Sequence, residues 1–285
     1  MINLDALKNL AYPQMEQSVQ PRDAMLYALG IGLGDDPTDP WQLRFVYEGG
    51  LQVFPTMAIT LCYPSGQVDF GAITGLNPHK VLHVYQRFEL ARPIPIGRPL
   101  VGQTRVVDVF DKGPGRGVLW AYRNEIRERT SGELVCTLDA ASMCVGAGGT
   151  GWQSAGAPPP KREVPSSAPT AVVDIATLPQ AALIYRLSGD YNPVHADPEL
   201  ARRVGFPRPI LHGRCTFGVA GRAVAQSLAA EDRSLRSMQA RFTAPVYPGE
   251  IIRTQIWRDA EAVSFRASVP ARGAVVLDGG YAELL

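Results

Sequence analysis

The two halves of the chain repeat one order of hydrophobic patterns. Each begins with a short stretch in which apolar side chains recur three and four residues apart before a glycine, at residues 23–32 and 180–190. This spacing predicts a helix. Each half then ends in segments of alternating apolar and polar residues, typical of half-buried antiparallel strands. The predicted strands are 100–110, 117–128 and 134–145 in the first half and 250–259, 262–271 and 274–284 in the second.

A stretch of different composition separates these halves. Residues 146–170 are dominated by Gly, Pro, Ala and Ser and include three consecutive prolines. Such a segment buries little apolar surface and favours an extended spacer, and a loop of this length inside one compact domain would be unusual. We therefore expect a first lobe at residues 1–145, a linker at 146–170 and a second lobe at 171–285.

A short internal sequence repeat indicates that one unit has been duplicated. Arg87-Phe88 is followed by a Pro-rich turn ending at Gly97, and Arg241-Phe242 by one ending at Gly249. Both predict a strand, a turn and the next strand. The pattern favours an α+β protein of two lobes, each an antiparallel sheet wrapped around a helix. Because only the second copy carries the cluster of polar residues described below, we expect a single active site.

Composition and charge exclude several classes of protein. The chain has 285 residues, 46% hydrophobic and 19% charged, with a net charge of +1, which is ordinary for a globular protein and favours neither nucleic acid nor an anionic membrane as partner. The N-terminus lacks a secretory signal pattern, and no apolar run approaches the ~20 residues of a membrane-spanning helix. The four cysteines are scattered without a CxxC pair, which fits free thiols in a reducing compartment. We expect a cytoplasmic enzyme with no nucleic-acid or membrane partner.

The segment 185–213 carries the residues best suited to chemistry. Asp190 and His195 flank an Asn192-Pro193 turn between two predicted helices. A carboxylate and an imidazole held close together can activate a water molecule between them. The same pattern also fits a structural loop, in which Asp190 caps a turn and His195 is a buried histidine.

Two other chemistries are conceivable from neighbouring residues. His212 and Cys215 are three apart and could form a cysteine hydrolase pair, but no third group is evident to orient them. Cys215 is better explained as a small buried residue. Asp190, His195 and Asp197 could bind a metal, although Asp197 is better placed to cap the following helix.

Two motifs resemble those of a known family. Ser-Gly-Asp-x-Asn-Pro-x-His at 188–195, followed by Gly-Phe-x-x-Pro-Ile-Leu-His-Gly at 205–213, resembles the signature of the MaoC-like (R)-specific enoyl-CoA hydratases, or hydratase 2. Blocks along nearly the whole chain, such as YALGIG, FVYEG and ARFTAPVYPG, are similar to the two-lobed type found in peroxisomal multifunctional enzymes. The resemblance implies a double hot-dog fold, with two antiparallel sheets each wrapped around a long helix. It also implies a hydro-lyase that reversibly hydrates trans-2-enoyl-CoA to (3R)-3-hydroxyacyl-CoA in fatty-acyl or steroid side-chain metabolism.

The resemblance also implies roles for individual residues. Asp190 and His195 would be the acid/base pair, Asn192 would orient the water or the pair, and the backbone N–H of Gly213 would donate to the thioester oxygen. Glu48 matches a glutamate at or near the family's active site. The block around His83 departs from the family pattern Leu-His-Gly-Glu-Gln at the next two residues. Substrate and CoA contacts would come from His83, Val84, Lys112, Tyr191, Pro193, Val194 and Phe242.

The resemblance further implies that the substrate is an acyl-CoA thioester, of which CoA is a part. It implies no metal and no separate cofactor, and it implies a homodimer. Residues 56–78 would line or border the space for the acyl chain. Two alternatives stay open: a hot-dog acyl-CoA thioesterase, which shares the fold but not the motif, and a non-catalytic acyl-CoA-binding module. Nothing in these patterns separates a straight acyl chain from a branched or steroid one.

Overall fold

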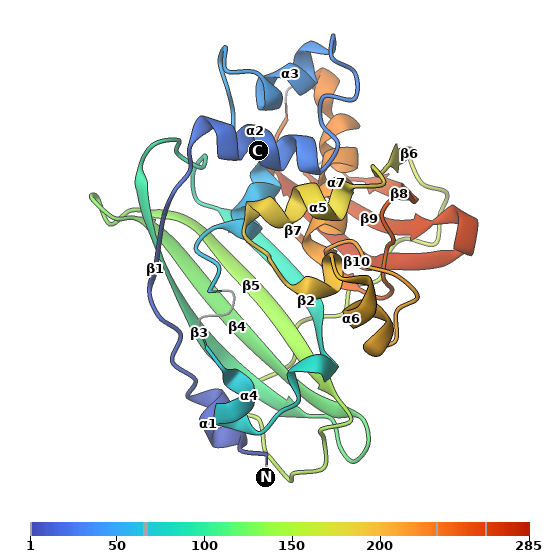
Figure 1. The fold of residues 1–285 in the computed structure, drawn as a ribbon. Coiled ribbons are helices and arrows are strands. Elements are labelled where there is room, and N and C mark those ends of the chain that lie inside the picture. The colour runs from blue at the N-terminus through green and yellow to red at the C-terminus, as the bar shows by residue number, and fades with distance from the viewer. Residues whose placement is uncertain (1, 65–67, 232, 260) are drawn as a thin grey trace.

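One antiparallel sheet organises the protein. A computed structural model describes residues 2–64, 68–231, 233–259 and 261–285. Its strands follow the order β1-β3-β4-β5-β2-β7-β10-β9-β8-β6, so the first five strands form one half and the last five the other, side by side (Figure 1). The strands are β1 (Met15–Ser18), β2 (Val81–Leu90), β3 (Pro99–Asp111), β4 (Gly117–Glu128), β5 (Leu134–Val145), β6 (Ala171–Ala176), β7 (Leu235–Phe242), β8 (Ile251–Arg258), β9 (Ala262–Val269) and β10 (Ala274–Leu284).

Short helices and 3₁₀ turns complete both halves. Those of the first half are α1 (Leu4–Lys8), α2 (Pro21–Gly30), α3 (Pro40–Val46), η1 (Pro55–Thr60), α4 (Phe70–Thr74) and η2 (Pro78–Lys80). Those of the second half are α5 (Ala181–Tyr185), η3 (Arg186–Ser188), η4 (Pro193–His195), α6 (Pro198–Arg203), α7 (Gly213–Gln226), η5 (Ala229–Glu231) and η6 (Pro270–Arg272). Among the described helices, none combines the length and the apolar character needed to cross a membrane.

The predicted strands agree closely with the observed ones. Strands β4, β5 and β10 begin and end at the predicted residues, and β3 and β8 differ by one residue at each end. Strand β9 ends earlier than predicted, at Val269, because Pro270 lacks the N–H that would continue the ladder. The predicted helices correspond to α2 and to α5 with η3. The short edge strands β1 and β6 were not predicted.

The internal Arg-Phe repeat lies at the junction of the two halves. Residues 85–89 of β2 pair antiparallel with residues 237–241 of β7. The two Arg-Phe copies therefore lie at the C-terminal parts of neighbouring central strands. This arrangement places the repeated units back to back and makes one continuous sheet from two halves.

Helix α7 is the core of the second half. Nearly all its residues are buried, and it contacts every strand from β6 to β10. A Cβ on Gly218 would lie 2.6 Å from Ile31, and one on Gly221 would lie 2.5 Å from Thr56, so both glycines allow first-half elements to pack tightly on the helix. Glycine also lowers helix propensity by ~1 kcal/mol, which explains why this helix was not predicted from the sequence.

The first half has a shorter helical cover. No helix in the described part of that half is as long as α7, and the 3₁₀ helix η1 packs between the sheet and α7 instead. The α+β class and the double hot-dog arrangement are confirmed, since both halves are antiparallel sheets curved around helical segments. The shorter cover leaves room for a cavity over β2 to β5.

Residues 146–170 contain no helix or strand, as predicted for a spacer, but they are fastened to the sheet. Asp111 accepts hydrogen bonds from the backbone N–H groups of three consecutive residues of this segment. The indole N–H of Trp257 donates to the carbonyl of Ser167 at 2.8 Å, and the guanidinium of Arg162 lies 3.9 Å from the ring centroid of Tyr281. The segment is thus held by both halves.

Candidate active site

A tight loop between η3 and α6 positions the predicted acid/base residues. Gly189 ends η3 with a φ of +110°, a conformation that glycine adopts without strain. The side chain of Asn192 then caps η4 by accepting a hydrogen bond from the N–H of Val194 at 3.1 Å. The carboxylate of Asp190 accepts from the N–H of Asn192 at 3.2 Å. Asp190 and His195 therefore lie at the two ends of one well-defined turn, as the sequence predicted.

His212, the residue before α7, joins these two residues. Donor or acceptor atoms of Asp190, His195 and His212 all lie within 4.8 Å of one another. The two imidazole rings are stacked, with centroids 3.7 Å apart and an interplanar angle of 25°. The sequence had placed His212 in the second motif and in a conceivable pair with Cys215, but not in this cluster.

Backbone carbonyls fix the tautomer of each histidine. Nδ1 of His195 lies 2.9 Å from the carbonyl oxygen of Ile210, and because a carbonyl only accepts, Nδ1 carries the hydrogen and Nε2 a lone pair. Nε2 of His212 lies 3.0 Å from the carbonyl oxygen of Asp190 and donates to it. His212 is held as a support for the Asp190 loop, while His195 keeps a basic nitrogen free.

The three groups differ in charge at neutral pH. Burial lowers the pKa of His195, although its bond to Ile210 and the charge of Asp190 act in the opposite direction. Burial and the neighbouring His195 lower the pKa of His212 to about 3. Burial would raise the pKa of Asp190, but the charge of Arg214 and the two imidazoles hold it below its usual value. A carboxylate therefore faces a neutral imidazole, and both can accept hydrogen bonds from one water molecule.

Gly213 begins α7 beside this cluster. The first N–H groups of a helix have no partner within the helix and carry partial positive charge. A Cβ on Gly213 would lie 3.2 Å from the ring of Phe242, whose centroid is 4.7 Å from that of His83. Burial lowers the pKa of His83 to about 3, so this ring is neutral. The structure thus brings together Gly213, Phe242 and His83, which the sequence placed in one site.

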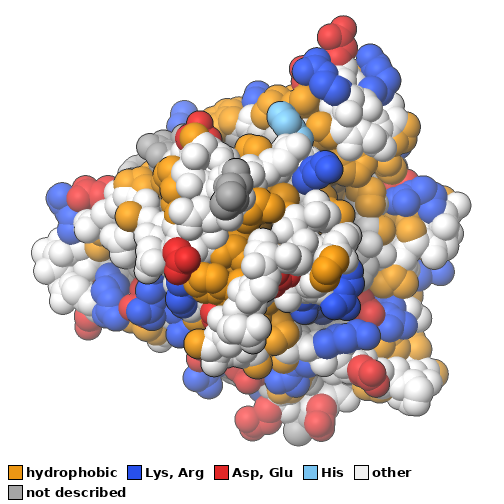
Figure 2. All heavy atoms as spheres, turned by 90° about the horizontal axis from the view of Figure 1, so that it is seen from below, with side chains coloured by type: hydrophobic (Ala, Val, Ile, Leu, Met, Phe, Trp, Pro, Cys, Tyr) orange, Lys and Arg blue, Asp and Glu red, His pale blue; other side chains and the backbone are white. Residues whose placement is uncertain are grey.

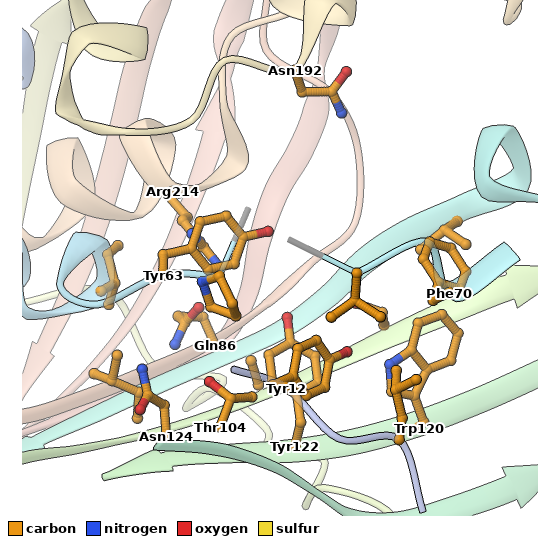
Figure 3. Close-up of a pocket in the computed structure, with 18 of the residues that line it drawn as sticks. Tyr12, Tyr63, Phe70, Gln86, Thr104, Trp120, Tyr122, Asn124, Asn192 and Arg214 are labelled. Atoms are coloured by element: carbon orange, nitrogen blue, oxygen red, sulfur yellow. The ribbon is translucent and has the colours of Figure 1, made fainter. Parts of the chain in front are cut away.

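A cavity of about 360 Å³ opens next to the cluster. Its walls come from β2 to β5, α1, α4 and the segment 56–78, of which residues 65–67 lie outside the described chain. Residues 56–78 are the segment predicted to border the acyl chain, and that role stays a prediction. Asn192 and Arg214 of the second half reach its edge (Figure 3). In Figure 2, hydrophobic side chains are visible in a recess near the middle of the face, with both basic and acidic side chains around it. The first half therefore supplies the walls of the cavity and the second half the polar residues at its edge.

Arg214 is the main residue that sequence reasoning missed. It is only 6% exposed and lines the cavity directly after Gly213. The available signal was a positive charge in the mostly apolar sequence of α7, a position where a charge needs a partner or a function; the other arginine of this helix, Arg222, pairs with Asp35.

Two of the residues predicted to act in the site lie elsewhere. Glu48 is exposed in the turn after α3. Lys112 lies in the turn between β3 and β4, where its backbone N–H donates to Gly117. Neither lines the cavity or belongs to the histidine cluster, so their roles stay predictions.

The remaining predicted substrate contacts surround the loop or β2. Tyr191 is 55% exposed and lies near the guanidinium of Arg186, and Pro193 and Val194 form η4. Val84 lies at a bulge in β2 and packs with Tyr85 and Phe110 in a small cluster separate from the main core. Of these residues, those in the loop lie closest in sequence to the acid/base pair.

The histidine cluster does not fit a single metal ion. Ring nitrogens bind metals along in-plane lone pairs at about 2.0–2.1 Å, and two rings stacked within 25° aim those lone pairs nearly parallel. Asp197 instead caps α6 by accepting from the N–H of Glu199 at 2.8 Å. The thiol of Cys215 is buried beside the carbonyl of Gly30, and burial raises its pKa, so it is not the activated nucleophile of a hydrolase. All four cysteines are free and buried.

Comparison with known families accounts for most of the chain. The MaoC like domain matches residues 160–278, and the MFE-2 hydratase 2 N-terminal domain matches residues 18–146. The chain is 40% identical over 276 residues to 3-hydroxyacyl-thioester dehydratase Y of Mycobacterium tuberculosis, covering 92% of this chain and 91% of the relative. It is 34% identical over 300 residues to the peroxisomal enoyl-CoA hydratase 2 of Arabidopsis thaliana, covering 99% and 95%.

Solved structures agree with this comparison. The crystal structure of a MaoC-like dehydratase from Phytophthora capsici superposes with a TM-score of 0.85 at 34% identity, covering 100% of this chain and 99% of that one. A Mycobacterium tuberculosis protein described as a double hotdog fold superposes with a TM-score of 0.56 at 18% identity, covering 97% and 95%. At that identity the likeness shows the fold alone.

Proposed function

The chain belongs to the MaoC-like hydratase 2 family, and from this premise we propose that it reversibly adds water to trans-2-enoyl-CoA, giving (3R)-3-hydroxyacyl-CoA. The observation that carries the proposal is the juxtaposition of an ionised Asp190 with a neutral His195 at the edge of a cavity. Such a pair can hold a water molecule and take a proton from it, although neither group is a strong base.

The acid/base pair would act on one water molecule. The water donates one hydrogen to the carboxylate of Asp190 and the other to Nε2 of His195, so its oxygen lone pair is directed at C3 of the substrate. As the C3–O bond forms, His195 takes a proton, and the electron pair of the C2–C3 double bond moves toward the thioester carbonyl. The pair then returns a proton to C2. The overall reaction breaks one O–H bond and the C2–C3 π bond, and it forms one C–O and one C–H bond.

Gly213 would stabilise the charge that develops on the thioester oxygen. Its N–H lies at the start of a 14-residue helix, where the partial positive charge of the helix terminus adds to the hydrogen bond. A donor of this kind contributes about 3 kcal/mol to transition-state stabilisation. The absence of a Cβ lets the start of the helix pack closely against the Phe242 ring, and it would also let the thioester oxygen approach the backbone N–H. Asn192 shapes the loop by capping η4, so we propose that it orients Asp190.

We infer that the lobes divide the work between them. Residues 1–145 would enclose the acyl group, since most of the cavity wall comes from them. Residues 171–285 would supply the acid/base groups, and residues 146–170 would connect the lobes. The acyl-CoA substrate follows from the family, and the proposed chemistry uses only this substrate, water and the side chains named.

Other parts of the proposal rest on resemblance alone. Glu48 and Lys112 would contact substrate or CoA only through a rearrangement or through another subunit. A homodimer stays a prediction that light scattering on the purified protein tests. A cytoplasmic location stays a prediction that fractionation of the source cells tests.

The test is an assay with crotonyl-CoA and longer trans-2-enoyl-CoA thioesters. The proposal expects loss of the enoyl-thioester absorbance, formation of the (3R) product on chiral analysis, and no free thiol. Release of CoA thiol would indicate the thioesterase alternative, and binding without turnover at any chain length would indicate a non-catalytic module. The family matches favour neither alternative, because they are to hydratases and dehydratases.

A further inference from the structure

Arg214 is a buried cation at the wall of the cavity. It is the second residue of α7, it is 6% exposed, and its guanidinium carbon lies 3.5 Å from the ring centroid of Tyr63. Figure 3 shows it entering from the second half, beside Tyr63 and above the strands of the first. Stacking on an aromatic ring satisfies the face of the guanidinium. Tyr63 is also a hydrogen-bonding neighbour of Arg214, but one neutral side chain cannot satisfy the five donors of the N–H edge.

Among the described residues, this edge has no anionic partner in contact with it. Within the described residues, no carboxylate forms an ion pair with Arg214 and no carbonyl accepts a hydrogen bond from it. Asp190 is near enough for the two charges to influence each other, but it is not in contact. A guanidinium has five N–H donors, and a buried one without an anionic partner in contact is unfavourable. The arrangement therefore favours an acceptor that arrives with the ligand.

The rest of the described cavity wall also suits a polar, anionic group. No described residue that lines the cavity is acidic, so Arg214 is the one charged group among them. Gln86, Thr104 and Asn124 and the hydroxyl groups of Tyr12 and Tyr122 are also part of the wall (Figure 3). Gln86 and Asn124 donate their amide N–H groups to backbone carbonyls, and a plain alkyl chain offers no partner to the remaining polar groups of the wall.

We propose that Arg214 binds an anionic oxygen on the acyl group, so that the preferred substrates are enoyl-CoA thioesters whose acyl chain carries a carboxylate. This inference rests on the proposed function and names its substrate class. The carboxylate would lie against the N–H edge of Arg214, with the polar side chains of β2 to β4 around it. A charge-assisted pair of this kind excludes the alkyl analogue because the latter leaves the guanidinium unpaired.

Matched pairs of substrates test the inference. Each pair consists of trans-2-enoyl-CoA thioesters of equal chain length, one ending in a methyl group and one in a carboxylate, at three increasing lengths. The measured quantity is the ratio of kcat/KM for the carboxylate to that for the methyl compound. Using the ratio cancels any effect of Arg214 on Asp190, since both substrates share the same acid/base pair.

We expect the wild-type ratio to exceed one at one or more lengths and to fall about tenfold or more in Arg214→Leu. Arg214→Lys should retain part of the preference because it keeps the charge. Arg236→Leu, which removes an exposed arginine of β7, is the matched control and should leave the ratio unchanged. A wild-type ratio below one at every length, or an equal ratio in wild type and Arg214→Leu, overturns the proposal.

The same comparison can be made by binding alone. Calorimetry with the saturated acyl-CoA analogues of each pair measures the preference without turnover and covers the case in which Arg214→Leu is poorly active. If the wild-type protein hydrates no enoyl-CoA but binds the carboxylated analogue more tightly through Arg214, the proposed function fails and the inference stands. If it hydrates plain chains and shows no preference by either method, the inference fails and the function stands.

Discussion

The imidazole rings of His195 and His212 lie stacked, 3.7 Å apart at the centroids. His212 supports one face of the His195 ring, and the carbonyl of Ile210 holds its Nδ1–H. Two imidazolium ions at this separation would repel each other, so stacking and burial both favour the neutral forms. The relationship explains how His195 can be both fixed in orientation and available as a base at neutral pH.

Activity should fall at acidic pH as His195 becomes protonated. Burial lowers the pKa of His195, so the neutral, basic form persists below the ordinary value of ~6.5. Asp190 is ionised over the same range because its pKa is also lowered. A profile of kcat/KM against pH should therefore be flat near neutrality and decline with a midpoint below ~6.5. A midpoint above that value would contradict a buried neutral base.

The substitution His195→Gln tests the same base directly. It removes the base while keeping a polar side chain, and kcat should fall by about 10²–10⁴-fold with little change in KM. His79→Gln is the control, because His79 is exposed in η2. Equal kinetics for the two variants would remove His195 from the mechanism.

His83 should make the folded state less stable in acid. Its folded pKa is about 3 because of burial, below the ~6.5 of the unfolded chain. Between these values the unfolded state binds a proton and the folded state does not, so stability present above pH ~6.5 is lost as the pH falls. From pH 7 to pH 5 this single group should lower the free energy of unfolding by about 2 kcal/mol.

Urea unfolding at the two pH values measures this effect. His83→Gln should show a smaller decrease than the wild type, by about the same 2 kcal/mol, whereas His79→Gln should behave as the wild type does. Identical pH dependence in wild type and His83→Gln would show that His83 does not titrate as described.

Gly213→Ala tests close approach to the start of α7. The new methyl group would lie 3.2 Å from Phe242. Under the proposed function it would also obstruct the approach of the thioester to the N–H, so kcat/KM should fall about tenfold. The double variant Gly213→Ala/Phe242→Leu relieves only the contact with the ring. The double variant should keep a low kcat/KM if the thioester itself needs the space that the new methyl group fills. Full recovery in the double variant would assign the loss to Phe242 and not to the substrate.

Two glycines with the same backbone angle test how the connecting segment is held. Gly279 and Gly273 both have a φ of +58°. A Cβ on Gly279 would lie 2.5 Å from the carbonyl oxygen of Arg162, whereas one on Gly273 would meet nothing within 4 Å. Gly273→Ala should lower stability by about 1 kcal/mol through its backbone conformation alone, and Gly279→Ala by clearly more. Equal changes in Tm would show that residues 146–170 do not rest on β10.

The strands could be predicted from the sequence because their signal is local. Alternation along β4, β5 and β10 reports directly which side chains face the core, so even the ends were correct. Helix α7 was missed because its glycines serve packing against Ile31 and Thr56, a reason that lies in other parts of the chain. The short edge strands β1 and β6 depend on pairing with β3 and β8.

The residues of the site divide in the same way, into those with a local sequence signal and those placed by distant contacts. Asp190 and His195 could be predicted because one short loop holds both. His212 joins them through the folding of α7 against that loop, and Arg214 enters the cavity through contact with Tyr63 of the other half. Contacts between residues distant in sequence carry no local pattern, so these two residues emerged only from the structure.

Water activation by Asp190 is the central claim, and oxygen labelling tests it most directly. Wild-type enzyme and Asp190→Asn are incubated with a trans-2-enoyl-CoA in H₂¹⁸O, and label at C3 of the product is followed by mass spectrometry. The account predicts rapid incorporation by the wild type and a rate about 10²–10⁴-fold lower in the variant, with acyl-CoA affinity nearly unchanged. Comparable incorporation rates for the two proteins, or none by the wild type, would contradict it.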